Sequence, residues 1–115
     1  VGKTKLLIKR LDGVEGSGLQ SAASSLIDHL GKFSAVVLAG IPNNEISNKL
    51  VFVAAFSPDL VSDGLHAGNF ISGVAKLCGG GGGGRPNLAQ AGGSQPESLD
   101  FALEKANAEL IEQLS

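Results

Sequence analysis

The chain has 115 residues, 43% of them hydrophobic, and a formal net charge of −2, so it has room for one domain with a real core and not for a multidomain enzyme. The acidic balance excludes a uniformly basic nucleic-acid binder, and any contact with nucleic acid must depend on a local patch. One cysteine excludes an internal disulfide and argues against a cysteine-rich zinc site, and no apolar run reaches transmembrane length. The chain contains no Met and begins at Val1, so we expect it to be part of a longer protein.

The first quarter of the chain predicts a strand followed by a helix. Residues 5–11 (KLLIKRL) are mostly apolar with charged residues interleaved, as in a strand, and residues 12–18 form a glycine-rich loop. Ser17 is expected to cap the helix, with Gln20 completing a capping box, and Gly31 to end it. The buried side of this helix is predicted from residues at helical spacing: Leu19, Ala22, Ala23, Leu26, Ile27 and Leu30.

Two further strands are predicted in the middle of the chain. Residues 34–39 (SAVVLA) form a nearly continuous apolar run, which indicates a central strand covered on both faces. Residues 49–56 (KLVFVAAF) form the next strand, after a polar turn region over 40–48. Because nine loop residues are too few for a helical crossover, the two strands are expected to be antiparallel neighbours.

A second helix is predicted from near His66 to Gly79. Its apolar stripe repeats the spacing of the first helix: Ala67, Phe70, Ile71, Val74, Ala75 and Cys78. Gly68 and Gly73 lie inside it, and each costs about 1 kcal/mol relative to Ala, which close packing would explain. Cys78 falls on the stripe and is interpreted as a small buried hydrophobe.

The last part of the chain predicts a weak strand and a final helix. The strand covers residues 87–91, and Ser94 with Glu97 is expected to form a capping box. The helix then runs to about Leu114, with these residues on its buried side: Leu99, Ala102, Leu103, Ala106, Leu110 and Leu114. The predicted fold class is α/β (α+β): a single domain over residues 1–115, with a mixed four-stranded sheet covered by helices in the order βαββαβα.

An unbroken run of six glycines, Gly79 to Gly84, leads into Arg85 and Pro86. We expect a structured glycine-rich loop over residues 79–86 whose N–H groups point into one concavity suited to phosphate oxygens. Arg85 would add a planar cationic fork at its edge, and Pro86 would end the flexibility. The alternative is a flexible linker. The predicted helix before the run and the apolar segment and helix after it favour a structured loop over a linker.

No nucleophile–base pair and no cluster of metal ligands stands out in the sequence. His29 is interpreted as a structural histidine in a last helical turn. For His66 a structural role and a functional role both stay open, and the structural one is favoured. The pattern therefore indicates binding and not catalysis, with no catalytic residue and no metal site.

The segment GGGGGGRPNLAQAGG, preceded by GLHAGNFISGVAKLCG, closely resembles the glycine-rich signature in the C-terminal domain of alanyl-tRNA synthetases. That module is related to the DHH-associated domain of DHH phosphoesterases, which typically carry a histidine directly after the glycines. Arg85-Pro86 stands there in this chain, which favours the synthetase branch. The chain also differs from many relatives in its unbroken glycine run, in His66 where a lysine is common, and in Asn87-Leu88 where Asp-Met is common.

The resemblance implies a domain that is not an enzyme by itself, in a class II alanine–tRNA ligase that uses ATP, magnesium and zinc elsewhere. It implies no cofactor here, contact with the elbow of tRNA(Ala), and a link between the aminoacylation and editing halves. Other implied partners are the remaining synthetase domains and a homodimer, with no membrane. The location would be the cytoplasm, or a plastid or mitochondrion.

Ten residues are the candidate RNA contacts, chosen from the glycine run and its polar neighbours: Gly80, Gly81, Gly82, Gly83, Gly84, Arg85, Asn87, Gln90, His66 and Lys76. Two other functions stay open. One is a protein-interaction or dimerisation module of the synthetase, in which the glycines serve only close packing. The other is a nucleic-acid-binding lid of a DHH-family phosphoesterase.

Overall fold

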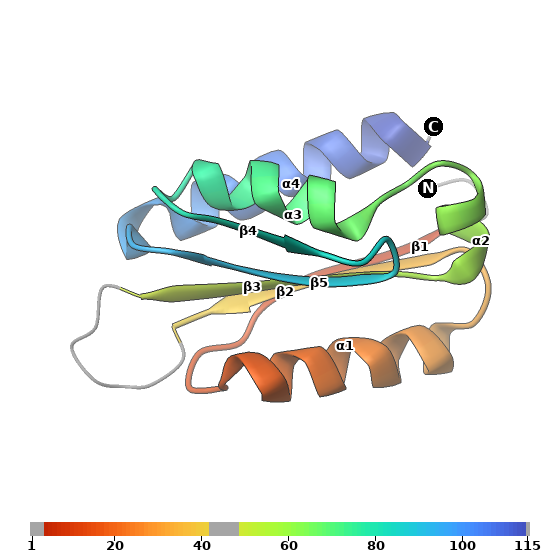
Figure 1. The fold of residues 1–115 in the computed structure, drawn as a ribbon, viewed down its shortest axis with the longest axis horizontal. Helices are drawn as coiled ribbons and strands as arrows, with labels where there is room; N and C mark the ends of the chain where they lie inside the picture. Colours follow the sequence, from red (N-terminus) through yellow and green to blue (C-terminus); the bar gives the residue numbers. More distant parts are fainter. Residues whose placement is uncertain (1–3, 42–48, 115) are drawn as a thin grey trace.

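Helices cover both faces of a mixed sheet in this protein (Figure 1). The structure, a computed structural model, describes residues 4–41 and 49–114. In chain order the elements are β1 (Lys5–Arg10), α1 (Gly16–Leu30), β2 (Ser34–Gly40), β3 (Leu50–Phe56), α2 (Pro58–Ser62), α3 (Ala67–Lys76), β4 (Gly81–Gly84), β5 (Leu88–Gly93), the 3₁₀ turn η1 (Pro96–Ser98) and α4 (Leu99–Leu114). The predicted fold class is confirmed.

The sheet has five strands in the order β1-β2-β3-β5-β4, in place of the four predicted. β1 runs parallel to β2, and the other neighbouring pairs are antiparallel, including β2 with β3 as expected. Every residue of β2 is buried, which confirms a central strand covered on both faces. The edges of the sheet are β1 and β4, and the polar turn expected between β2 and β3 falls mostly on residues 42–48, outside the described residues.

Alternate residues of the central strands pack into two separate hydrophobic cores, one on each face of the sheet. Val36 and Leu38 of β2 pack with Leu19 and Ala23 of α1 on one face. The other face of β2 packs in the larger core under α3 and α4, together with Phe52 of β3. This alternation is the period-2 pattern of a pleated strand, and it leaves α1 alone on its face while α3 and α4 share the opposite one (Figure 1).

The first helix begins earlier than its predicted cap. Its N-cap is Glu15, with no side-chain capping bond, so the expected cap at Ser17 is wrong. Gln20 is not part of a capping box either, because its amide donates to the side chain of Gln90 on β5. Gly31 ends the helix as expected, at φ 85°, with its N–H donating to the Ile27 carbonyl (3.0 Å).

The second predicted helix is shorter than expected, and a small helix before it was missed. α3 ends at Lys76 because the chain then turns back: the N–H groups of Gly79 and Gly80 donate to the carbonyls of Lys76 and Ala75 (3.2 and 2.9 Å). Gly79 takes φ 71° in this turn. The missed helix is α2, which has proline in its first turn, as helices tolerate.

The glycine run forms a strand and not a loop, which corrects the expectation for residues 79–86. Gly81–Gly84 is β4, paired with β5 in the register Gly81↔Gly92 to Gly84↔Ala89. Glycine has a poor strand propensity, so the sequence alone did not indicate this. Pairing with β5 and packing against α3 supply the order that the glycines lack.

The C-terminal segment matches its predicted side chains but not its predicted start. A 3₁₀ turn precedes α4, which begins at Leu99 with no capping bond recorded from Ser94. The predicted buried side is confirmed for four residues: Leu99, Ala102, Ala106 and Leu110. Leu103 is only partly buried, and the side chain of Leu114 lies outside what the structure describes.

Candidate functional site

The candidate site lies on the β4–β5 hairpin, whose turn carries Arg85 and Asn87. The Arg85 N–H donates to the Leu88 carbonyl oxygen (3.1 Å) and closes the turn. In an antiparallel ladder hydrogen-bonded and non-hydrogen-bonded pairs alternate, so Gly83 and Gln90 form the next hydrogen-bonded pair. The N–H groups of Gly81 and Gly83 are therefore used in the ladder, and those of Gly79 and Gly80 donate to carbonyls at the end of α3. The N–H groups of Gly82 and Gly84 point to the outer edge of β4, so the described glycine run is an extended strand and not the expected concavity of N–H groups.

The hairpin turn is docked on the N-terminus of α3. The N–H groups of Ala67 and Gly68 donate to the carbonyls of Pro86 and Arg85 (2.8 and 3.3 Å). The N–H of Asn69 donates to Nδ1 of His66, the N-cap residue (3.1 Å). The N–H groups that normally make a helix N-terminus attractive to anions are thus occupied, and the turn is held in place.

Alternate glycines of the run have different surroundings. A Cβ added at Gly80 would lie 1.8 Å from the Gly92 carbonyl oxygen, and one at Gly82 would lie 2.5 Å from Cα of Ala91. At Gly84 it would lie 2.9 Å from Cα of Ala89. Real Cβ atoms do not approach backbone so closely. These three even-numbered positions therefore require glycine for packing, as the protein-interaction alternative supposed for the whole run.

The odd-numbered glycines are open. A Cβ added at Gly81 or Gly83 would meet nothing within 4 Å, and one at Gly92 would meet only the Leu50 carbonyl oxygen at 3.5 Å, an ordinary contact. None of the three has a positive φ. Gly81 pairs directly with Gly92, and Gly83 with Gln90, so all three lie on one face of the hairpin. We call Gly81, Gly83 and Gly92 the glycine platform.

The glycine platform faces the α1 side of the sheet. Gln90 points to that side, because its amide oxygen accepts from Gln20 of α1. Leu88 packs in the core beneath α1. By the same alternation Arg85, opposite Leu88, belongs to this face. Its side chain is exposed and makes no ion pair or hydrogen bond with the other residues that the structure describes.

Two hollows flank this surface. One of about 510 Å³ lies at the far end of the platform, between Gly81, Gly92, Gly16 at the start of α1, and Lys49. The other, of about 200 Å³, lies beside the turn and includes Asn87. One hollow is therefore lined by the start of β4, and the other by α1, β3 and the residues that follow Arg85 in the hairpin turn.

The structure separates the ten predicted contacts into three groups. Gly81, Gly83, Arg85, Asn87 and Gln90 lie on the α1 side of the hairpin, although the Gln90 side chain is already bonded to α1. Gly80, Gly82 and Gly84 are packing positions. His66 and Lys76 lie at opposite ends of α3, about 15 Å apart by the rise of a ten-residue helix. The predicted set thus does not form one continuous surface.

The sequence analysis missed Gly92 as a platform residue, and it missed the division between odd and even glycines. A period-2 pattern across the run, read together with Gly92-Gly93, could have indicated both. That signal needs the pairing register of β4 and β5, which the sequence does not give.

Cys78 is buried, and burial, with a smaller contribution from Glu97, raises the pKa of its thiol, so it stays protonated at neutral pH. Within residues 4–41 and 49–114 no three His, Cys, Asp or Glu side chains are placed to hold a metal ion. No helix in that part of the chain is both long enough and apolar enough to cross a membrane.

Comparison with known proteins gives a consistent family. The DHHA1 domain model matches residues 3–112. The alanine–tRNA ligase of Prochlorococcus marinus (strain NATL1A) is 85% identical over 115 residues, 100% of this chain and 13% of that protein. The alanine–tRNA ligase of Synechococcus sp. (strain RCC307) is 57% identical over 114 residues, 99% of this chain and 13% of that protein. The chain therefore spans about an eighth of these relatives.

A solved structure gives the same answer for the fold. The crystal structure of the C-Ala domain from Aquifex aeolicus alanyl-tRNA synthetase is 31% identical, with a TM-score of 0.76 over 89% of this chain and 86% of that one. The chain belongs to the DHHA1 domain family, and it has the fold of a C-Ala domain of alanyl-tRNA synthetase.

Proposed function

We propose that this domain is a tRNA-binding module of an alanine–tRNA ligase and that its partner is tRNA(Ala). In this proposal it contacts the tRNA elbow and links the aminoacylation and editing halves of the synthetase, while ATP, magnesium and zinc are bound elsewhere in that protein. Relatives named alanine–tRNA ligase, at 85% and 57% identity, support the parent activity. A cytoplasmic or organellar location and a homodimer stay predictions.

The observation that carries the proposal is the exposed guanidinium of Arg85 beside a strand without side chains. A guanidinium pairs with phosphate through two parallel hydrogen bonds, and no described carboxylate competes for it. The turn that holds Arg85 is fixed on α3 through the Pro86 and Arg85 carbonyls, so little order must be gained on binding. An RNA backbone can approach the bare strand closely.

The proposal also limits how strong the binding can be. The domain has a net charge of −2, and Lys76 and His66 belong to α3, away from the α1 side of the hairpin. A surface with one or two phosphate contacts gives a shallow dependence on salt, with log Kd rising by about 1 to 2 for each unit of log salt. We therefore expect the domain to assist the rest of the synthetase and not to bind tRNA tightly alone.

The test is fluorescence anisotropy of labelled tRNA(Ala) at low salt with the 115-residue chain. Arg85→Ala should weaken binding about tenfold and reduce the salt slope by about one, since a charge-assisted bidentate pair is lost. The matched control is Lys9→Ala, which removes the same charge at the far edge of the sheet. Equal losses in the two variants, or none in Arg85→Ala, would contradict the proposal.

Elbow contact is tested with competitors. Full-length tRNA should displace the labelled tRNA, while a minihelix that contains only the acceptor and T arms should not. A minihelix that competes equally would leave tRNA binding standing and remove the elbow. The dimerisation alternative predicts instead a concentration-dependent dimer in sedimentation runs, with no affinity for tRNA.

A further inference from the structure

The cap of α3 depends on one nitrogen of an imidazole ring. Nδ1 of His66 accepts from the Asn69 N–H at 3.1 Å, so Nδ1 carries no proton in this state. The ring also lies close to the helix backbone, because a Cβ added at Gly68 would lie 2.9 Å from Cε1 of His66. Imidazole is the side chain that ordinarily changes charge between about pH 5 and 8. The acceptor of this cap can therefore be lost within that range.

The first turn of α3 is shared between the cap and the hairpin turn. The N–H groups of Ala67 and Gly68 donate to the carbonyls of Pro86 and Arg85 (2.8 and 3.3 Å), while the next N–H donates to the imidazole. Three successive N–H groups of one helical turn are thus bound, two by the hairpin and one by His66. Because they belong to the same turn, fraying at the cap weakens the docking of the hairpin as well.

A protonated ring has a second partner close by. His66 and Glu109 of α4 line one hollow of about 230 Å³, together with Gln113, whose amide donates to the Glu109 carboxylate (3.3 Å). Apart from His66, Glu109 is the one charged side chain among the described residues that line this hollow, and the acidic residues of α2 do not reach it. The hairpin turn presents backbone carbonyls to the helix, since the Arg85 side chain belongs to the α1 side.

We propose that His66 is a pH-sensitive switch, which fixes the hairpin turn on α3 when it is neutral and loosens the turn when it is protonated. Imidazolium has an N–H donor at both nitrogens and cannot accept from the Asn69 N–H. Its positive charge is also unfavourable at a helix N-terminus, whereas Glu109 across the hollow attracts it. The docked state thus binds fewer protons than the loosened state. Docking is complete when the ring is neutral, and it weakens as the pH falls.

The test is amide hydrogen exchange of the 115-residue chain, expressed as protection factors so that the intrinsic effect of pH on exchange is removed. Between about pH 7.5 and 5.5, protection at the Ala67, Gly68 and Asn69 N–H groups should fall about fivefold in the wild type, the usual value of an N-cap. His66→Asn keeps a capping acceptor that does not titrate, so its protection factors should stay constant. The Cε1–H signal of His66 in the NMR spectrum should shift over the same pH range as the wild-type protection.

Two further variants serve as controls. His29→Asn removes the other histidine of the chain, on α1, and should leave the wild-type pH dependence intact. Glu109→Gln removes the partner of the imidazolium, so the loss of protection should move to a pH about 0.5 lower. Wild-type protection that does not change with pH, or that falls equally in His66→Asn, would overturn the inference. An unshifted loss in Glu109→Gln would overturn the role given to Glu109. None of these results depends on tRNA binding.

Discussion

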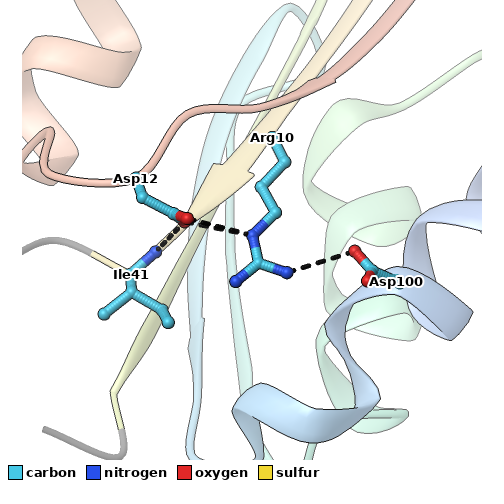
Figure 2. Close-up of polar contacts among 4 residues, drawn as sticks. All are labelled: Arg10, Asp12, Ile41 and Asp100. Atoms are coloured by element: carbon cyan, nitrogen blue, oxygen red, sulfur yellow. Dashed lines mark hydrogen bonds and ion pairs between the residues drawn. The ribbon is translucent and has the colours of Figure 1, made fainter.

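The two edge strands of the sheet differ in almost every respect. β1 carries Lys5, Lys9 and Arg10 and is tied down by side chains: Nζ of Lys5 donates to the Leu30 carbonyl oxygen (3.0 Å). Arg10 bridges Asp12 and Asp100, at 3.1 and 3.2 Å, and so joins the end of β1 to the start of α4 (Figure 2). β4 is four glycines, with no side chain at all.

The difference shows two ways to protect a sheet edge. Charged residues on β1 oppose the addition of another strand, a common device at edges. β4 is instead short and lies close beside α3, so its edge is guarded by backbone packing. Only the second way leaves a strand face free of side chains, and that face is the surface where we place RNA.

The largest expected loss of stability comes from disrupting the packing of the glycine run against β5. Gly80→Ala should destabilise the domain by several kcal/mol, on the order of 3 to 5, because the added Cβ would lie 1.8 Å from the Gly92 carbonyl oxygen and backbone must move. Urea unfolding followed by circular dichroism measures this. The midpoint should fall strongly.

The neighbouring residue supplies the control for that change. Gly81→Ala adds the same methyl group into open space, and it should be neutral or stabilise by about 0.4 to 1 kcal/mol, because the unfolded chain loses freedom. Similar unfolding midpoints for the Gly80 and Gly81 variants would show that the alternation of the glycines has no energetic meaning.

A smaller effect is expected where the glycine hairpin meets α3. His66→Ala removes the side chain that accepts from the Asn69 N–H and should cost about 1 kcal/mol, the usual value of an N-cap. His66→Asn keeps a capping acceptor and should restore most of the loss. Hydrogen exchange should be faster at the Ala67 and Gly68 N–H groups in the alanine variant.

If hydrogen exchange at those two N–H groups is unchanged while the free energy of unfolding is lowered, the His66 cap stabilises α3 without holding the hairpin turn in place. β1 lies at the other end of the sheet and should not respond to either substitution.

Periodicity was enough to predict the layers of this fold. The central strand over residues 34–39 is a continuous apolar run, and the structure extends it by one residue and buries it completely. The buried stripe of α3 was also predicted correctly, and Cys78, just beyond the end of the helix, is buried as predicted. Both patterns arise because residues that are buried in or against the sheet are apolar, so they can be recognised in the sequence.

The sequence of β4, the glycine edge strand, carries no comparable signal. Strand propensity argues against a strand at Gly81–Gly84, and its order comes instead from pairing with β5 and packing against α3. The same reason hid the division of the candidate contacts, since only the register shows that Gly82 faces Ala91 while Gly83 is open. The cap of the first helix was misplaced because Gln20 bonds to Gln90, a tertiary contact.

The ion pairs of Arg10 on β1 are expected to contribute less to the free energy of unfolding than the glycine packing of β4. Arg10→Ala removes two ion pairs, but the Arg10 side chain is 35% exposed and that of Asp100 is 80% exposed. Water and salt screen such pairs, so the loss should be at most about 1 kcal/mol and should shrink further in high salt. Urea unfolding at low and high salt measures both quantities. A loss that is independent of salt would mean that packing, and not charge, explains it.

The smallest effect concerns acid stability at Asp12. Its pKa lies below the ordinary value, first because its carboxylate accepts from the Ile41 N–H (3.1 Å) and then because of Arg10 (Figure 2). A lowered pKa in the folded state gives stability above the unfolded value of about 4, and that stability is lost as pH falls through the folded value. Asp12→Asn does not titrate but can still accept from Ile41, so its stability should fall less steeply than that of the wild type below about pH 4. Parallel curves of unfolding free energy against pH would assign the acid sensitivity of the domain to other carboxylates.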